Sequence, residues 1–149
     1  MKEVIVYTDG GCWNGKRSNP GGWASILQYK NVVKELSGFE PRTTNNRMEL
    51  TAAIMSLKKL EEPCSVTLHT DSKYVKKGIT EWINTWQHNG WQTSARQPVK
   101  NKELWVELNT LSKVHKIKWK WVPGHSGQRQ NERCDVLVQQ AIKENKDNW

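Results

Sequence analysis

Residues 4–11, VIVYTDGG, and residues 66–74, VTLHTDSKY, are two runs of strand-forming side chains that both stop at the dipeptide Thr-Asp. β-Branched and aromatic residues favour strands, so Asp9 and Asp71 are expected at the ends of two strands. Sites in parallel sheets form at the carboxyl ends of the strands. If these two strands are neighbours, the two carboxylates meet at one sheet edge. They then repel each other unless a proton, a basic group or a hard cation compensates.

Two further acids are predicted to join this pair. Glu49 is expected in the first turn of a helix within residues 43–60, and Asp135 in the first turn of a last helix over about residues 132–143. Helix N-termini tolerate carboxylates. Four carboxylates without a histidine or cysteine cluster offer oxygen ligands, which suit Mg²⁺ or Mn²⁺ better than zinc. An aspartate at a strand end is more often a turn former or cap, so the residues alone leave that alternative open.

The order of the remaining elements predicts a mixed α/β fold. Strands are expected over residues 21–29, 32–39, 65–70 and 117–122, and helices over 43–60, 72–77, around 82–86, and from a cap at Asn101. A strand that returns after a helix indicates parallel pairing in part of the sheet. With 149 residues and no linker, the chain is expected to be one domain, residues 1–149.

The charge and composition limit the kinds of partner that the protein is expected to bind. The chain has 23 Lys and Arg against 15 Asp and Glu, a net charge of +8, which suits a polyanion such as nucleic acid or an anionic membrane. A soluble basic protein without such a partner is the alternative. The three cysteines are odd in number and widely spaced, and no apolar stretch approaches the roughly 18 residues of a membrane span. A cytoplasmic protein that enters no membrane is expected.

Six motifs in order resemble those of a bacterial type 1 ribonuclease H: YTDGGC, GGWASIL, TTNNRMEL, HTDSKYV, WVPGHSG and NERCD. The resemblance covers about residues 4–141. It implies a ribonuclease H-like fold, a five-stranded mixed sheet with flanking helices. It also implies Mg²⁺-dependent cleavage of the RNA strand of RNA–DNA hybrids by a monomer, with two ions per site in the substrate complex and Mn²⁺ as the alternative ion.

The resemblance also assigns roles to single residues. It gives metal binding and catalysis to Asp9, Glu49, Asp71 and Asp135, the four acids reached above, and a mobile-loop role to His125. A histidine there suits proton transfer near neutral pH. Glu132 matches an acid beside the site, a second-shell partner in the family. An ordinary charge in the first turn of a helix explains it equally well.

Substrate contacts are the second set that the resemblance implies. The amides of Asn45 and Asn46 can both donate to and accept from a 2′-hydroxyl, although one of them can instead cap the helix. The full set of predicted contacts is Cys12, Asn19, Thr44, Asn45, Asn46, Lys100, Asn101, Trp82 and Trp105. Thr44 and Asn101 match a pocket for a DNA-strand phosphate, with Lys100 and Arg47 as nearby cations. Trp82, four residues before Trp86, is more typical of a core position than of a stacking platform.

Two segments depart from the family pattern. The loop after the first strand, CWNGKRSNPGG, is longer by two residues, so the substrate-contacting asparagine is either Asn14 or Asn19, and the following Pro-Gly-Gly favours Asn19. The second is the handle, which we define as residues 86–101, WQHNGWQTSARQPVKN. Relatives are strongly basic where this handle has Gln87, His88 and Asn89. Weaker hybrid binding than in those relatives is therefore expected.

Three functions from different classes fit these patterns to different degrees. An endonuclease is expected, in which one ion activates water and a second stabilises the leaving 3′-oxygen. A non-catalytic hybrid-binding module is the alternative, but a pure binder gains nothing from clustered negative charge where phosphates approach. A phosphoryl-accepting domain would need a D-x-D pair or a strand-end lysine opposite the acids, and the sequence shows neither.

Overall fold

A five-stranded mixed sheet forms the centre of the protein in the computed structural model, which describes residues 1–13, 19–123 and 129–149. The strands lie in the order β3-β2-β1-β4-β5. β1 pairs antiparallel with β2, and β2 with β3, whereas β4 runs parallel to both β1 and β5. The predicted five-stranded mixed sheet is therefore confirmed. The strand bounds are β1 Lys2–Cys12, β2 Asn19–Tyr29, β3 Val32–Thr43, β4 Cys64–Thr70 and β5 Lys116–Trp121.

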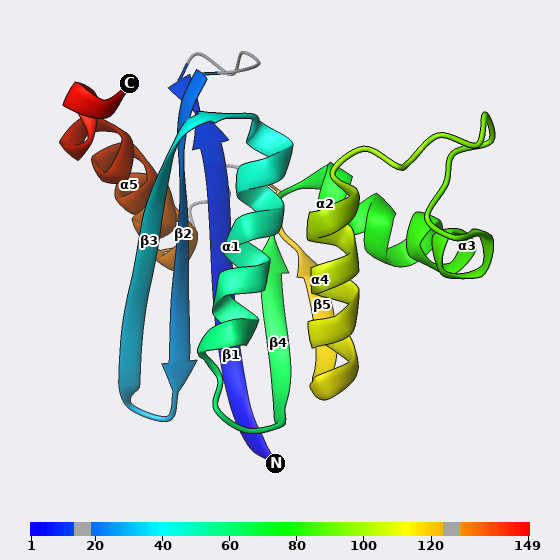
Figure 1. Ribbon diagram of the computed structural model, residues 1–149. Coiled ribbons are helices and arrows are strands. Elements are labelled where there is room, and N and C mark those ends of the chain that lie inside the picture. Colours follow the sequence, from blue (N-terminus) through cyan, green and yellow to red (C-terminus); the bar gives the residue numbers. More distant parts are fainter. Residues whose placement is uncertain (14–18, 124–128) are drawn as a thin grey trace.

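Helices cover both faces of this sheet (Figure 1). α1 and α4 lie side by side on one face, and α5 packs against β1, β2 and β3 on the other. The helix bounds are α1 Asn45–Lys59, α2 Lys73–Lys77, the π-helical turn η2 Gly78–Trp82, α3 Ile83–Asn89, α4 Lys102–Val114, α5 Arg129–Glu144 and the short η3 Lys146–Asn148. No helix within the described ranges is long and apolar enough to cross a membrane.

The alternation of side chains along the central strands produces two separate cores. Val4 and Val6 of β1 point to the α1 face and pack with Leu50 and Leu57, which lie on the buried side of α1. On the opposite face, Ile26 and its neighbours on β2 pack against α5. Both faces of β1 are therefore covered over much of its length. The strand can hold the side chains that it carries in fixed positions.

The caps of the first two helices agree with the sequence. The Oγ1 of Thr44 accepts a hydrogen bond from the Arg47 N–H at 3.2 Å and starts α1, and Ser72 caps α2 in the same way. Asn101 precedes α4 but makes no side-chain cap bond. Asn101 is the N-cap residue by position, as predicted, but its side-chain amide bonds to Arg47 and Tyr74 instead of the helix.

β1 extends further than the sequence predicted. Its parallel ladder with β4 stops at the pair Tyr7–His69, but its antiparallel ladder with β2 continues to Cys12. Asp9 therefore lies inside β1, just beyond the point where β4 leaves the sheet, and not at a strand end. Asp9 and Asp71 are nevertheless neighbours, as predicted, because Asp71 follows the last residue of β4.

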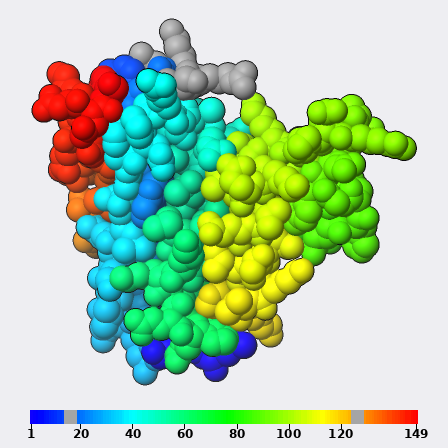
Figure 2. Space-filling model, in the orientation of Figure 1, coloured from blue at the N-terminus to red at the C-terminus, as the bar shows by residue number. Residues whose placement is uncertain are grey.

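A contact between Gly78 and Trp105 orients the handle. Gly78 lies against the indole ring of Trp105, a fully buried residue of α4. A Cβ at position 78 would overlap that ring. The chain then runs through η2 into α3, which projects from the body of the protein (Figure 2). Trp82, Trp86 and Trp91 line the inner side of this projection and pack against the main core.

Gly78→Ala should therefore destabilise the protein, because the added methyl group must displace a buried tryptophan. Overpacking of this kind costs about 1–3 kcal/mol. Urea unfolding of the variant should show this loss in the free energy of unfolding, whereas the neighbouring exposed substitution Lys77→Ala should change it little. Equal stability of the two variants would mean that the handle does not rest on this contact.

Candidate active site

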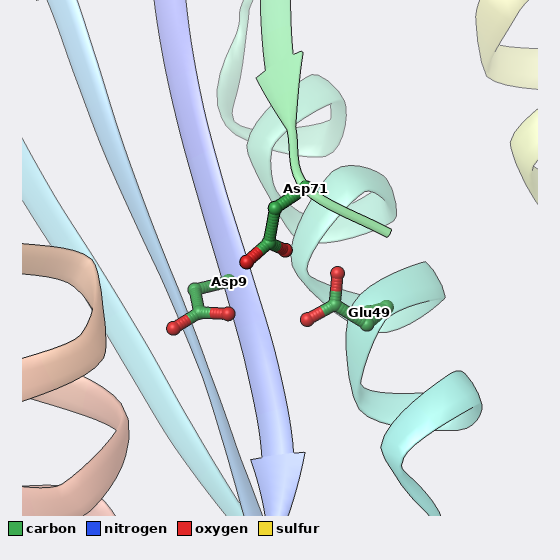
Figure 3. A group of neighbouring side chains, drawn as sticks. All are labelled: Asp9, Glu49 and Asp71. Atoms are coloured by element: carbon green, nitrogen blue, oxygen red, sulfur yellow. The ribbon is translucent and has the colours of Figure 1, made fainter. Parts of the chain in front are cut away.

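Three carboxylates meet where β1, α1 and the end of β4 come together (Figure 3). Asp9 comes from β1, Glu49 from α1 and Asp71 from the residue after β4, and their side chains point toward one another. One carboxylate oxygen from each residue lies within 4.8 Å of those of the other two. Three oxygen donors at this separation suit a hard divalent cation. Among the described residues the cluster is therefore a candidate metal site.

Gly10 holds two of these acids on its main chain. Its N–H donates to Oδ1 of Asp9 at 2.9 Å and to Oε1 of Glu49 at 2.6 Å. A Cβ at position 10 would overlap the main chain of Met48 and come within 2.6 Å of the Glu49 nitrogen. Only glycine allows β1 and α1 to approach this closely. The glycine after Asp9 is thus a structural requirement of the site.

The burial of the cluster makes its charges costly. Glu49 is only 8% exposed, and its Oε2 has no hydrogen-bond partner among the described residues. Burial raises the pKa of Glu49 well above its ordinary value, and the charges of Asp9 and Asp71 raise it further. Burial, reinforced by the charge of Asp71, also raises the pKa of Asp9 to about 7. A cation among these oxygens would relieve both effects.

Glu49 and Asp135 do not lie where the sequence placed them along their helices. α1 begins at Asn45, so Glu49 is already past the first turn, and α5 begins within the described residues at Arg129, so Asp135 lies in its second turn. Asp135 is exposed and does not join the three-acid group. Its charge is nevertheless close enough to raise the pKa of Asp9. Glu132, also exposed, occupies the first turn of α5.

An ion pair on the far side of α5 fixes the position of this helix. The guanidinium of Arg133 donates to both carboxylate oxygens of Glu35 on β3, at 2.6 and 3.0 Å. Arg133 is separated from Asp135 by Cys134, which is buried against β1 with its thiol 3.5 Å from the Tyr7 carbonyl oxygen. Cys134 and Cys64 are both buried and serve as packing residues.

Trp121 is a residue at this site that the sequence did not reveal. Its indole N–H donates to the main-chain carbonyl of Asp71 at 3.2 Å, and the ammonium of Lys76 lies 5.0 Å from its ring centroid. Trp121 therefore holds the segment that carries Asp71 after β4 has ended. The alternating pattern IKWKWV predicted the strand but gave no indication of this contact.

Several of the predicted substrate contacts lie at the end of β1 and at the start of α1. Oδ1 of Asn45 accepts from the Cys12 N–H at 2.8 Å, so the end of β1 is tied to the start of α1. Asn46 is half-buried one residue further on. Nδ2 of Asn19 donates to the Trp13 carbonyl at 2.9 Å and closes the base of that loop. Asn14 and His125 lie outside the described residues.

The predicted phosphate pocket is already linked by hydrogen bonds in the free protein. Arg47 Nη1 donates to Oδ1 of Asn101 at 3.1 Å, and Nδ2 of Asn101 donates to the Tyr74 hydroxyl at 3.1 Å. Arg47 also pairs with Glu103 at 2.7 Å, and this hydrogen bond lowers the pKa of Glu103. Lys100, next to Asn101, is exposed. In the predicted phosphate pocket, the carboxylate of Glu103 is thus already paired with the guanidinium of Arg47.

The structure corrects one predicted substrate contact. Trp105 is fully buried, and its indole N–H donates to the Tyr74 hydroxyl at 2.9 Å. No face of its ring is open to a substrate, so its role is to support the pocket from below. Trp82 is half-buried and meets Tyr74 edge-on, with ring centroids 5.6 Å apart.

Comparisons with known proteins agree with this arrangement. The RNase H family model matches residues 1–143. The chain belongs to the ribonuclease H family. The chain is similar to ribonuclease H of Rhodopseudomonas palustris (strain TIE-1), 52% identical over 146 residues, which are 98% of this chain and 93% of that protein. Ribonuclease H of Hydrogenovibrio crunogenus (strain DSM 25203 / XCL-2) is 55% identical over 146 residues, 97% of this chain and 98% of that protein.

A solved structure confirms the fold of the family. The crystal structure of LC9-RNase H1, described as a type 1 RNase H with the type 2 active-site motif, superposes with a TM-score of 0.88 at 31% identity. The match covers 97% of this chain and 74% of that one. The resemblance drawn from the six sequence motifs is thereby confirmed.

The buried acids should make the metal-free protein less stable as the pH rises. The pKa of Asp9 is about 7 in the folded protein against an ordinary value of 3.8, so the unfolded chain loses this proton first and stability falls between these two values. Asp9→Asn removes this loss. In EDTA above pH 7 the variant should exceed the parent protein by roughly 1–4 kcal/mol, with the difference vanishing at acidic pH.

The measurement is urea unfolding on both sides of this pH range. Glu61→Gln, which neutralises an exposed carboxylate, is the matched control and should follow the parent protein at every pH. An Asp9→Asn variant that is less stable than the parent above pH 7 would contradict the assigned repulsion.

Proposed function

We propose that the protein is an endonuclease that hydrolyses the RNA strand of RNA–DNA hybrids. The observation that carries the proposal is the group of three converging carboxylates in a chain of the ribonuclease H family. One of them has a buried oxygen without a hydrogen-bond partner in the described part of the chain. A fold does not by itself define an activity, so the argument depends on this site and not on the sheet.

The residues present fit a divalent metal ion. All donors are carboxylate oxygens, which favour Mg²⁺ or Mn²⁺ over softer metals. Asp9, Glu49 and Asp71 would hold the ions, and Asp135 is our proposed fourth ligand. When bound, two such ions would lower the pKa of an attacking water and offset the charge that develops on the phosphate and the leaving oxygen.

The chain's own groups prepare this site before substrate arrives. Gly10 stabilises the ionised forms of Asp9 and Glu49 through its N–H, and Trp121 fixes the main chain of Asp71. Hydrogen bonds to a charged carboxylate are stronger than those to a neutral group, so Gly10 partly offsets the cost of burial. The acids are therefore preorganised, and the ions need not reorder the main chain.

Substrate recognition is proposed on the same face as α1. Asn45 and Asn46 would read the 2′-hydroxyls of the RNA strand beside Cys12, because amides both donate and accept. Thr44 and Asn101, with the cations Arg47 and Lys100, would hold a phosphate of the DNA strand. His125 is proposed to carry a proton during turnover, Glu132 to act beside the site, and Asn19 and Trp82 to contact the hybrid.

We also propose that residues 1–149 act as one domain, as a monomer and in the cytoplasm. The three cysteines support a reducing compartment, because none forms a disulfide in the described residues. A non-catalytic hybrid-binding module is disfavoured by the acid cluster, which would repel phosphates and cost stability without serving binding.

The decisive experiment is cleavage of a labelled RNA–DNA hybrid. The protein should cut the RNA strand with Mg²⁺ and not with EDTA, and Asp71→Asn should abolish cutting while hybrid binding persists or improves. Glu61→Gln is the matched loss of one carboxylate and should cut normally. Cleavage by Asp71→Asn near the parent rate would refute the metal assignment, and a hybrid bound but never cut would favour the binding module. Duplex DNA should resist cutting because it lacks 2′-hydroxyls.

The pairing of Arg47 with Glu103 generates a second prediction. A DNA phosphate must compete with Glu103 for the guanidinium, and an exposed pair of this kind is worth about 0.2–1 kcal/mol. Glu103→Gln should therefore lower KM for the hybrid by up to about fivefold and leave kcat unchanged.

The control is Glu107→Gln, one turn further along α4, which breaks an equivalent exposed pair with Lys58 at 3.6 Å. This variant should not change KM. If both substitutions lower KM equally, the effect is one of net charge, and Arg47 does not contact the phosphate.

A further inference from the structure

Three lysines form a row along the edge strand β5. Lys116, Lys118 and Lys120 alternate with Ile117 and Trp119, so they all point to the face of the sheet opposite α1. All three are exposed, and no salt bridge among the described residues involves any of them. We name these three residues the lysine row.

The neighbouring strand places polar groups beside the lysine row, and no acids. In the parallel register of β4 and β5, Lys116 pairs with Ser65, Lys118 with Thr67 and Lys120 with His69. The two hydroxyls are hydrogen-bond donors that complement an ammonium at a phosphate. The row therefore has the donors that a phosphate backbone needs.

This part of the sheet is open to a ligand. α5 packs over β1, β2 and β3 on this face, and among the described residues no helix packs extensively over β4 and β5 there. Ser65 and Thr67 line a shallow hollow of about 710 Å³, together with Glu3 and Ile5 from β1 and Gln28 from β2. The three lysines do not line this hollow but stand beside it, on the edge strand next to β4. A strand of nucleic acid can therefore reach the lysine row without any rearrangement of the fold.

The lysine row leads toward the acid cluster. Lys120 stands beside His69, which stacks on Tyr7 with ring centroids 4.5 Å apart, and Asp71 follows two residues later. Successive members of the row are roughly 6.7 Å apart along the strand, a spacing similar to that of adjacent phosphates in one nucleic-acid strand. A strand that leaves the acids around the end of β4 would thus meet one lysine after another.

Charge on an edge strand has a simpler use, which is to prevent edge-to-edge pairing of sheets. That use needs only an occasional charge, and three aligned ammonium groups on one face repel one another. It also does not explain why Ser65 and Thr67 stand opposite Lys116 and Lys118. A bound polyanion accounts for both features.

We propose that the lysine row binds the single-stranded continuation of the RNA strand whose scissile phosphate lies at Asp9, Glu49 and Asp71. This inference rests on the proposed function for the placement of that phosphate. A hybrid duplex would occupy the α1 side, where Asn45, Thr44 and Asn101 lie, whereas the lysine row is on the opposite face. Only a flexible single strand can pass from one side to the other around Asp71.

The test compares binding of a blunt hybrid with binding of hybrids whose RNA or DNA strand continues as a single strand at either end. Binding is followed by fluorescence anisotropy in EDTA, across a salt series. The variant Lys116→Gln/Lys118→Gln/Lys120→Gln keeps the side-chain stems and removes three charges. The control Lys34→Gln/Lys59→Gln/Lys143→Gln removes three exposed lysines from β3, α1 and α5 that are in no described salt bridge.

The parent protein should bind an RNA-extended hybrid more tightly than the blunt one, and the lysine-row variant should lose this gain. Each single-strand phosphate contact contributes about 0.7 to the slope of log K against log salt, so three lost contacts should make the slope shallower by about 2. Binding of the blunt hybrid should not change. If the triple variant folds poorly, Lys118→Gln alone should give about one third of this change.

Four results would overturn the proposal. They are an unchanged slope in the lysine-row variant, an equal loss in the control variant, an equal loss on the blunt hybrid, and an equal loss on the DNA-extended hybrid. The last two results would mean that the lysine row binds the duplex, or that it does not distinguish single-stranded RNA from single-stranded DNA. Because binding is read in EDTA, these outcomes are independent of the Mg²⁺-dependent cleavage that tests the proposed function.

Discussion

The approach of β1 to α1 at Gly10 is the constraint on which the site depends. One main-chain N–H there serves both Asp9 and Glu49, and the main chain of Met48 leaves no room for a side chain. The contact brings an acid from a strand and an acid from a helix to the same point. Everything else at the site, including the entry of Asp71 from β4, is built around this pair.

The same contact explains why a cation would stabilise the site. Gly10 supplies one donor, but the three carboxylates offer six oxygens, and Oε2 of Glu49 has no partner among the described residues. The raised pKa values of Asp9 and Glu49 express this shortage of positive charge. A fold that only needed stability would place neutral or apolar groups here, so the arrangement is best understood as a site adapted to bound metal ions.

The sequence predicted the order of elements and the meeting of three of the four acids, because both follow from local patterns and from the rule for parallel strands. It could not place Asp9 inside β1, since the end of that strand depends on pairing with β2. It misassigned Trp105, whose burial depends on Gly78, distant in sequence. It also missed Trp121, because alternation shows which face a residue occupies but not the carbonyl that it reaches.

The positive charge of the chain is distributed away from the handle. Residues 86–101 contain only Arg96 and Lys100 as full cations, and Lys102 follows directly after them. Arg47 near the pocket is shared with Glu103. The lysine row on β5, in contrast, has no described carboxylate partner. Unpaired cations contribute more to polyanion binding than paired ones, because a phosphate need not displace a carboxylate. The contacts with nucleic acid are therefore expected to extend around the acids onto the second face of the sheet. The handle is expected to contribute a smaller share of the binding free energy.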